Sequence, residues 1–322
     1  MDSVLDNLKE HEFAKRPVSG PPNSVDRLEV VPTGAALGAE VRGIDFAQPV
    51  PDDVKQKLNE FWFEHLVLLF RGQSLSQDDV SNASHVFGPT QDAAAKQYFR
   101  DTGQKPLGDS DHPDINRLSN LGPDGTPVKE NAGLGSLEVV WHSDNSYIET
   151  PPAGSMLYSR IIPPKGQGGL TSFNNQYLAY ETLPDDVKDR IKGKRLLHDA
   201  SRNSAGVLRP GVTLPTTPDE VPGPTHPLVR THPDSGRKAL YLGRRRIYPS
   251  SYIVGIPEEE SKELLDFLWD HACQDKFVWT QIWEVDDLLI WDNRCAMHCR
   301  DEINADYPRI LWRTQMKGEI PV

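Results

Sequence analysis

The fold is decided by three runs near the C-terminal end of the chain: Trp279-Thr280-Gln281-Ile282-Trp283, Asp287-Leu288-Leu289-Ile290-Trp291, and Arg309-Ile310-Leu311-Trp312-Arg313-Thr314-Gln315-Met316. Short runs that are rich in aliphatic and aromatic residues and bounded by turn-forming residues are typical of β-strands. Further strands are predicted upstream at 28–31, 66–70, 137–141, 154–161 and 171–173. The apolar spacing predicts helices at 52–65, 77–87, 184–192 and 257–273. We therefore expect a mostly β core decorated by a few α-helices.

The chain has 322 residues, enough for one large domain with a substantial core. Residues 1–25 are polar, with Pro and Gly among charges, and predict a flexible N-terminal arm. Residues 26–322 predict a single domain. Within it, residues 89–135 lack regular periodicity and predict a long irregular region of the kind that often forms binding loops.

The composition excludes several classes of protein. A formal net charge of −12 argues against general nucleic-acid binding. No apolar run reaches the roughly 20 residues of a membrane span, and the start resembles no secretory signal, so a cytoplasmic location without membrane contact is expected. The three cysteines are too few for a disulfide framework and predict free thiols.

A metal site is suggested by Trp141-His142-Ser143-Asp144. Residues two apart on a strand share a face, so His142 and Asp144 can chelate one ion. His298, which follows the run ending at Trp291, is the candidate third ligand. Two imidazoles and one carboxylate form the facial triad of non-haem iron(II) oxygenases. A His-x-Asp pair alone is a weak signal, and we interpret His226 and His232 as structural residues or as residues that support the metal ligands without binding the metal.

Two arginines strengthen this hypothesis. Arg309 and Arg313 are four apart on a predicted strand, so they share a face with Leu311 and Gln315 and lie about 13 Å apart. An inward-facing guanidinium in a β core is costly unless it meets an anion, which is either a carboxylate of the same sheet or a bound ligand. The position of both arginines behind a candidate metal ligand favours the bound anion.

At these residues the chain resembles the taurine/2,4-dichlorophenoxyacetate dioxygenase family, from about Leu28 to Gly318. Other landmarks of the resemblance are Gly38 to Asp45, Phe87-Gly88, Gly168 to Thr171, His226 to Pro233, Gly236-Arg237 and Asp292-Asn293-Arg294. The family has a double-stranded β-helix (jelly-roll) core, requires Fe(II), and uses 2-oxoglutarate and O2 as co-substrates. Its members commonly form dimers or tetramers, so a homo-oligomer is expected.

The resemblance also implies roles for individual residues. His142, Asp144 and His298 would bind the iron. Arg309 and Thr171 would bind 2-oxoglutarate, and Trp291 would pack beside the iron pocket. Arg313 would lie near the substrate or co-substrate.

The chain departs from taurine-type members after Phe87-Gly88, where Pro89 to Asp92 replace a His and a Tyr that hold the sulfonate. Glu138 stands where those members carry an Asn. Taurine is therefore disfavoured. Glu138, Asn120 and Tyr98 are the remaining candidates for substrate contact, with Arg313.

We expect a dioxygenase that oxidises, by hydroxylation, a small organic acid or sulfonate and releases succinate and CO2. One alternative is desaturation or another oxidative outcome on an amine-bearing acid, suggested by Glu138. A second alternative, of another class, is a zinc hydrolase with the same three ligands, which would leave Thr171, Arg309 and Arg313 unexplained.

Overall fold

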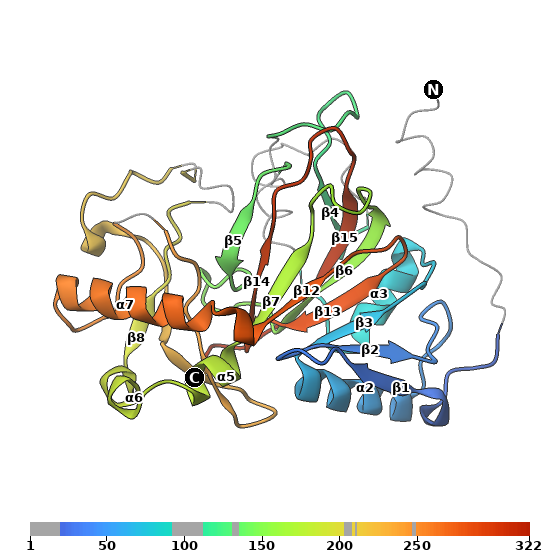
Figure 1. The fold of residues 1–322 in the computed structure, drawn as a ribbon, viewed down its shortest axis with the longest axis horizontal. Coiled ribbons are helices and arrows are strands. Elements are labelled where there is room, and N and C mark those ends of the chain that lie inside the picture. The colour runs from blue at the N-terminus through green and yellow to red at the C-terminus, as the bar shows by residue number, and fades with distance from the viewer. Residues whose placement is uncertain (1–19, 92–111, 131–134, 203–207, 210, 247–248) are drawn as a thin grey trace.

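Two β-sheets lie against each other in the centre of the structure (Figure 1). The structure, a computed structural model, describes residues 20–91, 112–130, 135–202, 208–209, 211–246 and 249–322. The larger sheet contains, in spatial order, β1 (Glu29–Pro32), β2 (Ala39–Arg42), β3 (Val67–Phe70), β13 (Leu288–Asp292), β6 (Gly154–Ile161), β15 (Ile310–Met316) and β4 (Asn116–Ser119). The smaller sheet contains β12 (Val278–Gln281), β7 (Thr171–Asn175), β14 (Ala296–Arg300) and β5 (Val139–His142).

Strand pairing is antiparallel within both sheets, except that β2 and β3 are parallel. Two short pairs stand apart from the sheets: β8 (Arg195–Leu197) with β9 (Thr225–Pro227), and β10 (Val229–Thr231) with β11 (Lys238–Leu240). An apolar cluster that includes Phe173 of the smaller sheet and Leu157, Leu289 and Leu311 of the larger one fills the space between the sheets. The inner faces of the two sheets thus pack together as one hydrophobic core.

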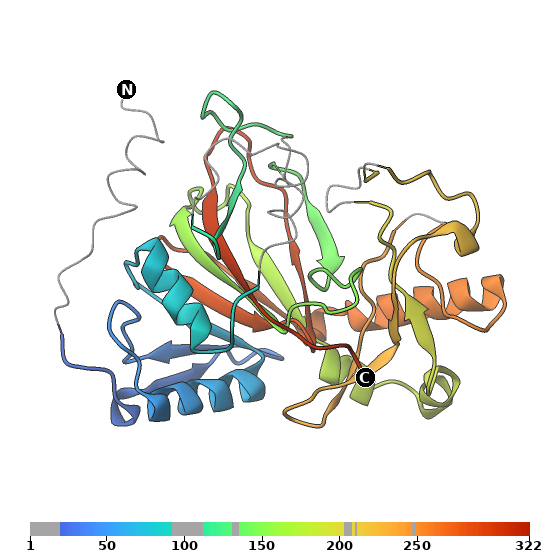
Figure 2. The ribbon, with the colours of Figure 1, turned by 180° about the vertical axis from the view of Figure 1, so that it is seen from behind.

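Helices cover the sheets from outside. They are α2 (Asp52–His65), α3 (Gln77–His85), α5 (Gln176–Glu181), α6 (Asp185–Ile191) and α7 (Glu258–Ala272), with short 3-10 turns at η1 (Val25–Arg27), η2 (Pro218–Glu220) and η3 (Asp275–Phe277). Figures 1 and 2 show α2 and α7 at opposite ends of the molecule. None of the helices in the described residues is long and apolar enough to cross a membrane.

Helix α2 shows how sequence and packing agree. Val54, Leu58, Phe61 and Trp62 recur at helical spacing and are the residues that it buries. Asp52 and Asp53 in the first turn complement the positive end of the helix dipole. The helix ends where the chain reverses at Leu66, whose φ is 66°, and β3 begins at the next residue.

The predicted helices and strands are confirmed to within a few residues, but the irregular region at 89–135 is partly wrong. It contains β4, an edge strand of the larger sheet, which pairs with β15. The sequence Asn116-Arg117-Leu118-Ser119 is polar and gives no strand pattern. Its strand conformation comes from the free edge that β15 offers.

The single domain and the arm remain predictions. Residues 1–19 lie outside the described residues. Before Leu28 the chain is already held to the body, because the buried Asn23 side chain donates to the carbonyl oxygens of Asp45 and Pro49. The three cysteines are free, as predicted.

Candidate metal centre and active site

Two strands of the smaller sheet bring the predicted metal ligands together. His142 of β5 and His298 of β14 are direct cross-strand partners, and their ring centroids are 4.1 Å apart. Oδ1 of Asp144, just beyond β5, lies 3.6 Å from Nε2 of His142 and 3.9 Å from Nε2 of His298. Ligand atoms of the three residues all lie within 4.8 Å of one another. The cluster therefore has the size and donor set that a divalent transition metal needs.

The protonation states suit a metal. Nδ1 of His142 lies 2.9 Å from the carbonyl oxygen of Val140 and therefore carries the ring hydrogen, which leaves the Nε2 lone pair facing Asp144. Burial and then the charge of Arg244 lower the pKa of His142, while burial and the neighbouring His142 hold the pKa of His298 well below its usual range. Both imidazoles are thus neutral at pH 7 and able to donate an electron pair.

The carboxylate of Asp144 is ionised, and neighbouring residues hold its orientation. Burial alone would raise its pKa, but the charge of Arg313 brings the pKa of Asp144 well below its ordinary value. Nη1 of Arg313 lies 3.6 Å from Oδ2 of Asp144, and Ser155 and Gln315 donate to the same oxygen over 2.8 and 3.3 Å. The buried Asn293 amide holds the backbone N–H and carbonyl of Asp144. Arg313 thus lies beside the metal centre, and its contact with substrate stays a prediction.

Trp291 packs against the ring of His298, and its place beside an iron pocket stays a prediction. Its ring centroid is 4.6 Å from that of His298 and 5.5 Å from that of Phe173. The three rings form an apolar wall that excludes water from one side of the imidazole and fixes its orientation.

Arg309, the predicted 2-oxoglutarate ligand, lies directly before the first residue of β15. The side chain is buried at 4% exposure, and in the described part of the chain no carboxylate lies within ion-pair distance of it. Burial, with a contribution from the charge of Arg300, lowers the pKa of Arg309 to about 9. It nevertheless stays a cation at pH 7. A buried cation of this kind is costly unless a ligand supplies the anion.

Thr171 of β7 lies two residues after Gly169, where an added Cβ would meet Nε of Arg309 at 3.1 Å. Its hydroxyl oxygen accepts a hydrogen bond from Nε1 of Trp283 over 3.0 Å, so its own hydrogen remains available to a ligand. Its cross-strand partner on β14 is Arg300, a second buried guanidinium, which donates to the carbonyl oxygens of Gly135 and Leu137. Arg300, Thr171 and Arg309 together make a buried site suited to a carboxylate.

The structure gives less support to the residues that the sequence suggests for substrate contact. Asn120 is buried, and its amide is occupied: it donates to Ser136 and to the carbonyl of Tyr307, and it accepts from the backbone N–H of Arg309 over 2.7 Å. This arrangement makes Asn120 a positioning residue for Arg309. Glu138 is exposed, and Tyr98 lies outside the described residues. Substrate contact by these residues remains a prediction.

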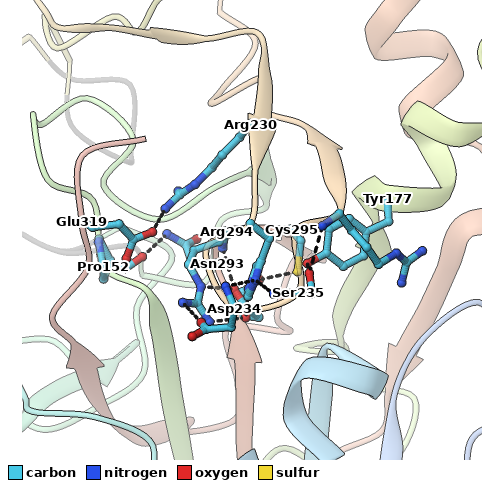
Figure 3. Close-up of polar contacts among 12 residues, drawn as sticks. Pro152, Tyr177, Arg230, Asp234, Ser235, Asn293, Arg294, Cys295 and Glu319 are labelled. Atoms are coloured by element: carbon cyan, nitrogen blue, oxygen red, sulfur yellow. Dashed lines mark hydrogen bonds and ion pairs between the residues drawn. The ribbon is translucent and has the colours of Figure 1, made fainter. Parts of the chain in front are cut away.

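A second cluster, His232 with Asp292 and Cys295, also places ligand atoms within 4.8 Å of one another. Nδ1 of His232 accepts the backbone N–H groups of Asp234 and Ser235, so Nε2 carries the hydrogen and donates it to Asp292 over 2.9 Å. Figure 3 shows Arg294 pointing to Asp234 in this network, and Arg294 also binds both oxygens of Asp292. Burial raises the pKa of Cys295 well above its ordinary value. The ring nitrogens of His232 and the carboxylate oxygens of Asp292 are thus already used in hydrogen bonds within the protein. The cluster is therefore structural.

His226 is also structural, as interpreted from the sequence. Its Nε2 lies 3.0 and 3.1 Å from the carbonyl oxygens of Ser146 and Ile148, which ties down the loop after Asp144.

Sequence reasoning missed Ser155, Arg300 and Arg244. Arg300 had a usable signal, because it lies two residues after His298 and shares that strand face. The sequence carried no usable signal for Ser155 or Arg244. Ser155 lies near Asp144, and Arg244 near His142, only because of how the strands pair.

Known proteins are similar to this chain in sequence and in structure. The family described as "Taurine catabolism dioxygenase TauD, TfdA family" matches residues 29–315. The alpha-ketoglutarate-dependent 2,4-dichlorophenoxyacetate dioxygenase of Burkholderia sp. (strain RASC) is 34% identical over 297 residues, covering 91% of this chain and 90% of that protein. The (S)-phenoxypropionate/alpha-ketoglutarate-dioxygenase of Delftia acidovorans is 29% identical over 307 residues, covering 90% of this chain and 95% of that protein. The crystal structure of AAD-2 in complex with Mn(II) and N-oxalylglycine has a TM-score of 0.77 and 27% identity, covering 91% of this chain and 99% of that one.

The sheets, the His-Asp-His cluster and these relatives define an oxidoreductase of the non-haem iron, alpha-ketoglutarate-dependent dioxygenase class. The chain belongs to the TauD/TfdA family. The alternative of a zinc hydrolase is contradicted by this membership.

Proposed function

We propose that this protein binds Fe(II) through His142, Asp144 and His298, and hydroxylates a small organic acid. The observation that carries the proposal is the buried cation of Arg309, which has no carboxylate partner in the described residues and lies in the same two-sheet core as the His-Asp-His cluster. A dicarboxylate that reaches both sites satisfies the metal and the guanidinium at once.

Each residue has a stated task in this proposal. Arg309 binds the distal carboxylate of 2-oxoglutarate, and Thr171 donates its hydroxyl hydrogen to the same group. When bound, iron(II) and 2-oxoglutarate supply the oxidising chemistry that consumes O2 and releases succinate and CO2. Trp291 and Phe173 keep water from the imidazole of His298. The two sheets would form a double-stranded β-helix, in which both ligand strands open onto one pocket.

The substrate class follows from charge and from the relatives. The pocket carries Arg313 and Arg244 in the vicinity of Asp144, and 2,4-dichlorophenoxyacetate and (S)-phenoxypropionate, the substrates printed in the names of two relatives, are carboxylates. We therefore place small carboxylates before sulfonates. The alternative of an amine-bearing acid depended on Glu138, and no contact of its exposed carboxylate with the metal ligands supports it.

A cytoplasmic location and a homo-oligomeric state remain proposals from the sequence.

The test is spectroscopic. Anaerobic protein is mixed with Fe(II) and 2-oxoglutarate, and the weak visible charge-transfer absorption of the chelate is recorded for wild type, His298→Ala and Arg309→Ala. We expect absorption in the wild type, none without His298, and a much higher 2-oxoglutarate requirement without Arg309. A folded, iron-loaded wild type that shows no absorption would contradict the proposal.

A further inference from the structure

Trp283 lies in the turn between β12 and β13, and its side chain points into the core. The side chain is 6% exposed, whereas Ile282 is 52% and Val285 is 56% exposed. The ring belongs to the apolar cluster between the two sheets, together with Phe173. Its indole Nε1 donates to Oγ1 of Thr171 over 3.0 Å. A turn on the outside of the molecule thus presents a buried hydrogen-bond donor to β7.

This hydrogen bond fixes what the hydroxyl of Thr171 can do. An indole N–H can only donate, so the oxygen of Thr171 accepts and the hydroxyl hydrogen must point to another group. The side chain of Thr171 is buried. Among the residues that the structure describes, no acceptor takes this hydrogen. Because a buried donor without an acceptor is costly, the hydrogen is placed for an acceptor that a ligand supplies.

The acceptor of this hydrogen should be an anion. Arg300 is the cross-strand partner of Thr171, so the two side chains share one face of the smaller sheet. Arg309, a second buried guanidinium, lies close to Gly169, where an added Cβ would meet its Nε at 3.1 Å. An ionised carboxylate only accepts hydrogen bonds, and it pairs well with guanidinium groups. A carboxylate therefore suits the hydroxyl hydrogen and the two cations together.

The turn that carries Trp283 is held from inside by Asp287, which is fully buried. Oδ2 of Asp287 accepts from Nε2 of Gln281 over 2.9 Å and from the backbone N–H of Glu284 over 2.8 Å. Nη1 of Arg71 lies 2.8 Å from the same oxygen. The carboxylate thus joins the residues before and after position 283. The indole N–H is therefore held in place before any ligand binds.

We propose that Trp283 is a positioning residue for co-substrate binding: by donating to Thr171, it directs the hydroxyl hydrogen of Thr171 to the distal carboxylate of 2-oxoglutarate. This inference rests on the proposed function and adds to it a residue that acts through Thr171. Hydrogen bonds in a chain strengthen one another, so the indole N–H makes Thr171 a stronger donor as well as an oriented one. Loss of the indole N–H should therefore weaken 2-oxoglutarate binding only while the hydroxyl of Thr171 is present.

The experiment is a double-mutant cycle of Trp283→Phe, Thr171→Val and the variant with both changes. Thr171→Ser, which keeps the hydroxyl, is combined with Trp283→Phe in the same way. Trp279→Phe is the matched control, because Trp279 lies on β12 and its ring stacks on Phe173 with centroids 5.9 Å apart. The dissociation constant of 2-oxoglutarate is measured anaerobically from the visible absorption of the Fe(II)-loaded protein. Fe(II) affinity and thermal melts of the ligand-free protein are recorded for each variant.

We expect Trp283→Phe to raise the dissociation constant of 2-oxoglutarate about 3- to 10-fold, with Fe(II) affinity unchanged. This effect should disappear in the Thr171→Val background and persist in the Thr171→Ser background, since the indole acts through the hydroxyl. Trp279→Phe should leave the dissociation constant of 2-oxoglutarate as it is in the wild type.

The proposal is overturned if Trp283→Phe binds 2-oxoglutarate as tightly as the wild type, or if it weakens binding equally with and without the hydroxyl of Thr171. If Trp283→Phe does not fold, the same cycle is run with benzothienylalanine at position 283, which keeps the shape of the indole and lacks its N–H. A folded wild type that shows no absorption with Fe(II) and 2-oxoglutarate would instead refute the proposed function.

Discussion

Ser155 donates its hydroxyl hydrogen to Oδ2 of Asp144 over 2.8 Å. Gln315 and Arg313 approach the same oxygen, whereas Oδ1 faces His142 and His298. The carboxylate is held in one orientation, because donors from β6 and β15 occupy one oxygen and leave the other for a metal. Partners of metal ligands commonly control metal affinity in this way.

Replacing Ser155 with Ala should weaken Fe(II) binding about tenfold, since the carboxylate loses its shortest anchor. Anaerobic metal titration measures this. Ser159→Ala is the control, because Ser159 lies on the same strand and is equally buried, but it bonds to Glu284 and Asp287. We expect Ser159→Ala to lower the free energy of unfolding and leave metal affinity unchanged. Equal metal affinity in wild type and Ser155→Ala would contradict the anchoring role.

Arg309→Met should separate ligand binding from folding. Removing a buried cation that lacks an ion-pair partner in the described residues should not lower the melting temperature of the ligand-free protein, since the charge is costly there. The same change should raise the 2-oxoglutarate requirement about 100-fold. Thermal melts with and without 2-oxoglutarate check both statements. A variant that is still stabilised by 2-oxoglutarate as strongly as the wild type would count against Arg309 as the ligand.

Gly169 gives a sharper test of the same site. Its φ is +82°, and a Cβ there would lie 3.1 Å from Nε of Arg309. Gly169→Ala should therefore displace Arg309 and weaken 2-oxoglutarate binding. Gly166→Ala is the matched control, because its φ of +87° imposes similar backbone strain but a Cβ there meets nothing within 4 Å. If both variants lose 2-oxoglutarate affinity equally, backbone strain and not contact with Arg309 is the cause.

The pH dependence of stability should involve His198. Its side chain is buried, neither ring nitrogen has a hydrogen-bond partner among the described residues, and burial with the neighbouring His226 holds its pKa well below 6.5. The folded state keeps this ring neutral while the unfolded chain takes up a proton near pH 6.5. Its contribution to stability is therefore present above that pH and is lost as the pH falls, by up to about 1.4 kcal/mol per pH unit.

His198→Phe removes that titration and keeps an aromatic ring of similar shape. Urea unfolding of the metal-free protein at pH 7.5 and 5.5 should show a smaller loss of stability at the lower pH than in the wild type. The wild type should still lose more than His198 alone explains, because the pKa values of His142, His226, His271 and His298 are also lowered. An identical loss in the variant and the wild type would exclude a role for His198.

Local sequence patterns were sufficient to predict much of the fold. Helix α2 matches its predicted bounds because a helix with one apolar face and acids in its first turn is determined by nearby residues. The face shared by Leu311, Arg313 and Gln315 was also correct, since alternation along a strand is a local property. Glu138 shows the limit of this reasoning. It precedes β5, where the register with β14 shifts, and such an irregularity changes which face a side chain occupies.

The sequence by itself determined the strands and helices, the ligand types and the class of chemistry, because periodicity and His-x-Asp spacing act over a few residues. Only the tertiary structure decided that His298 pairs with His142, that Ser155 holds Asp144, and that Arg244 pairs with His142 across an isolated bridge while Arg245 forms an ion pair with Asp266 of α7. These relationships join residues far apart in the chain. They depend on strand register across two sheets, which the packing of the whole core selects.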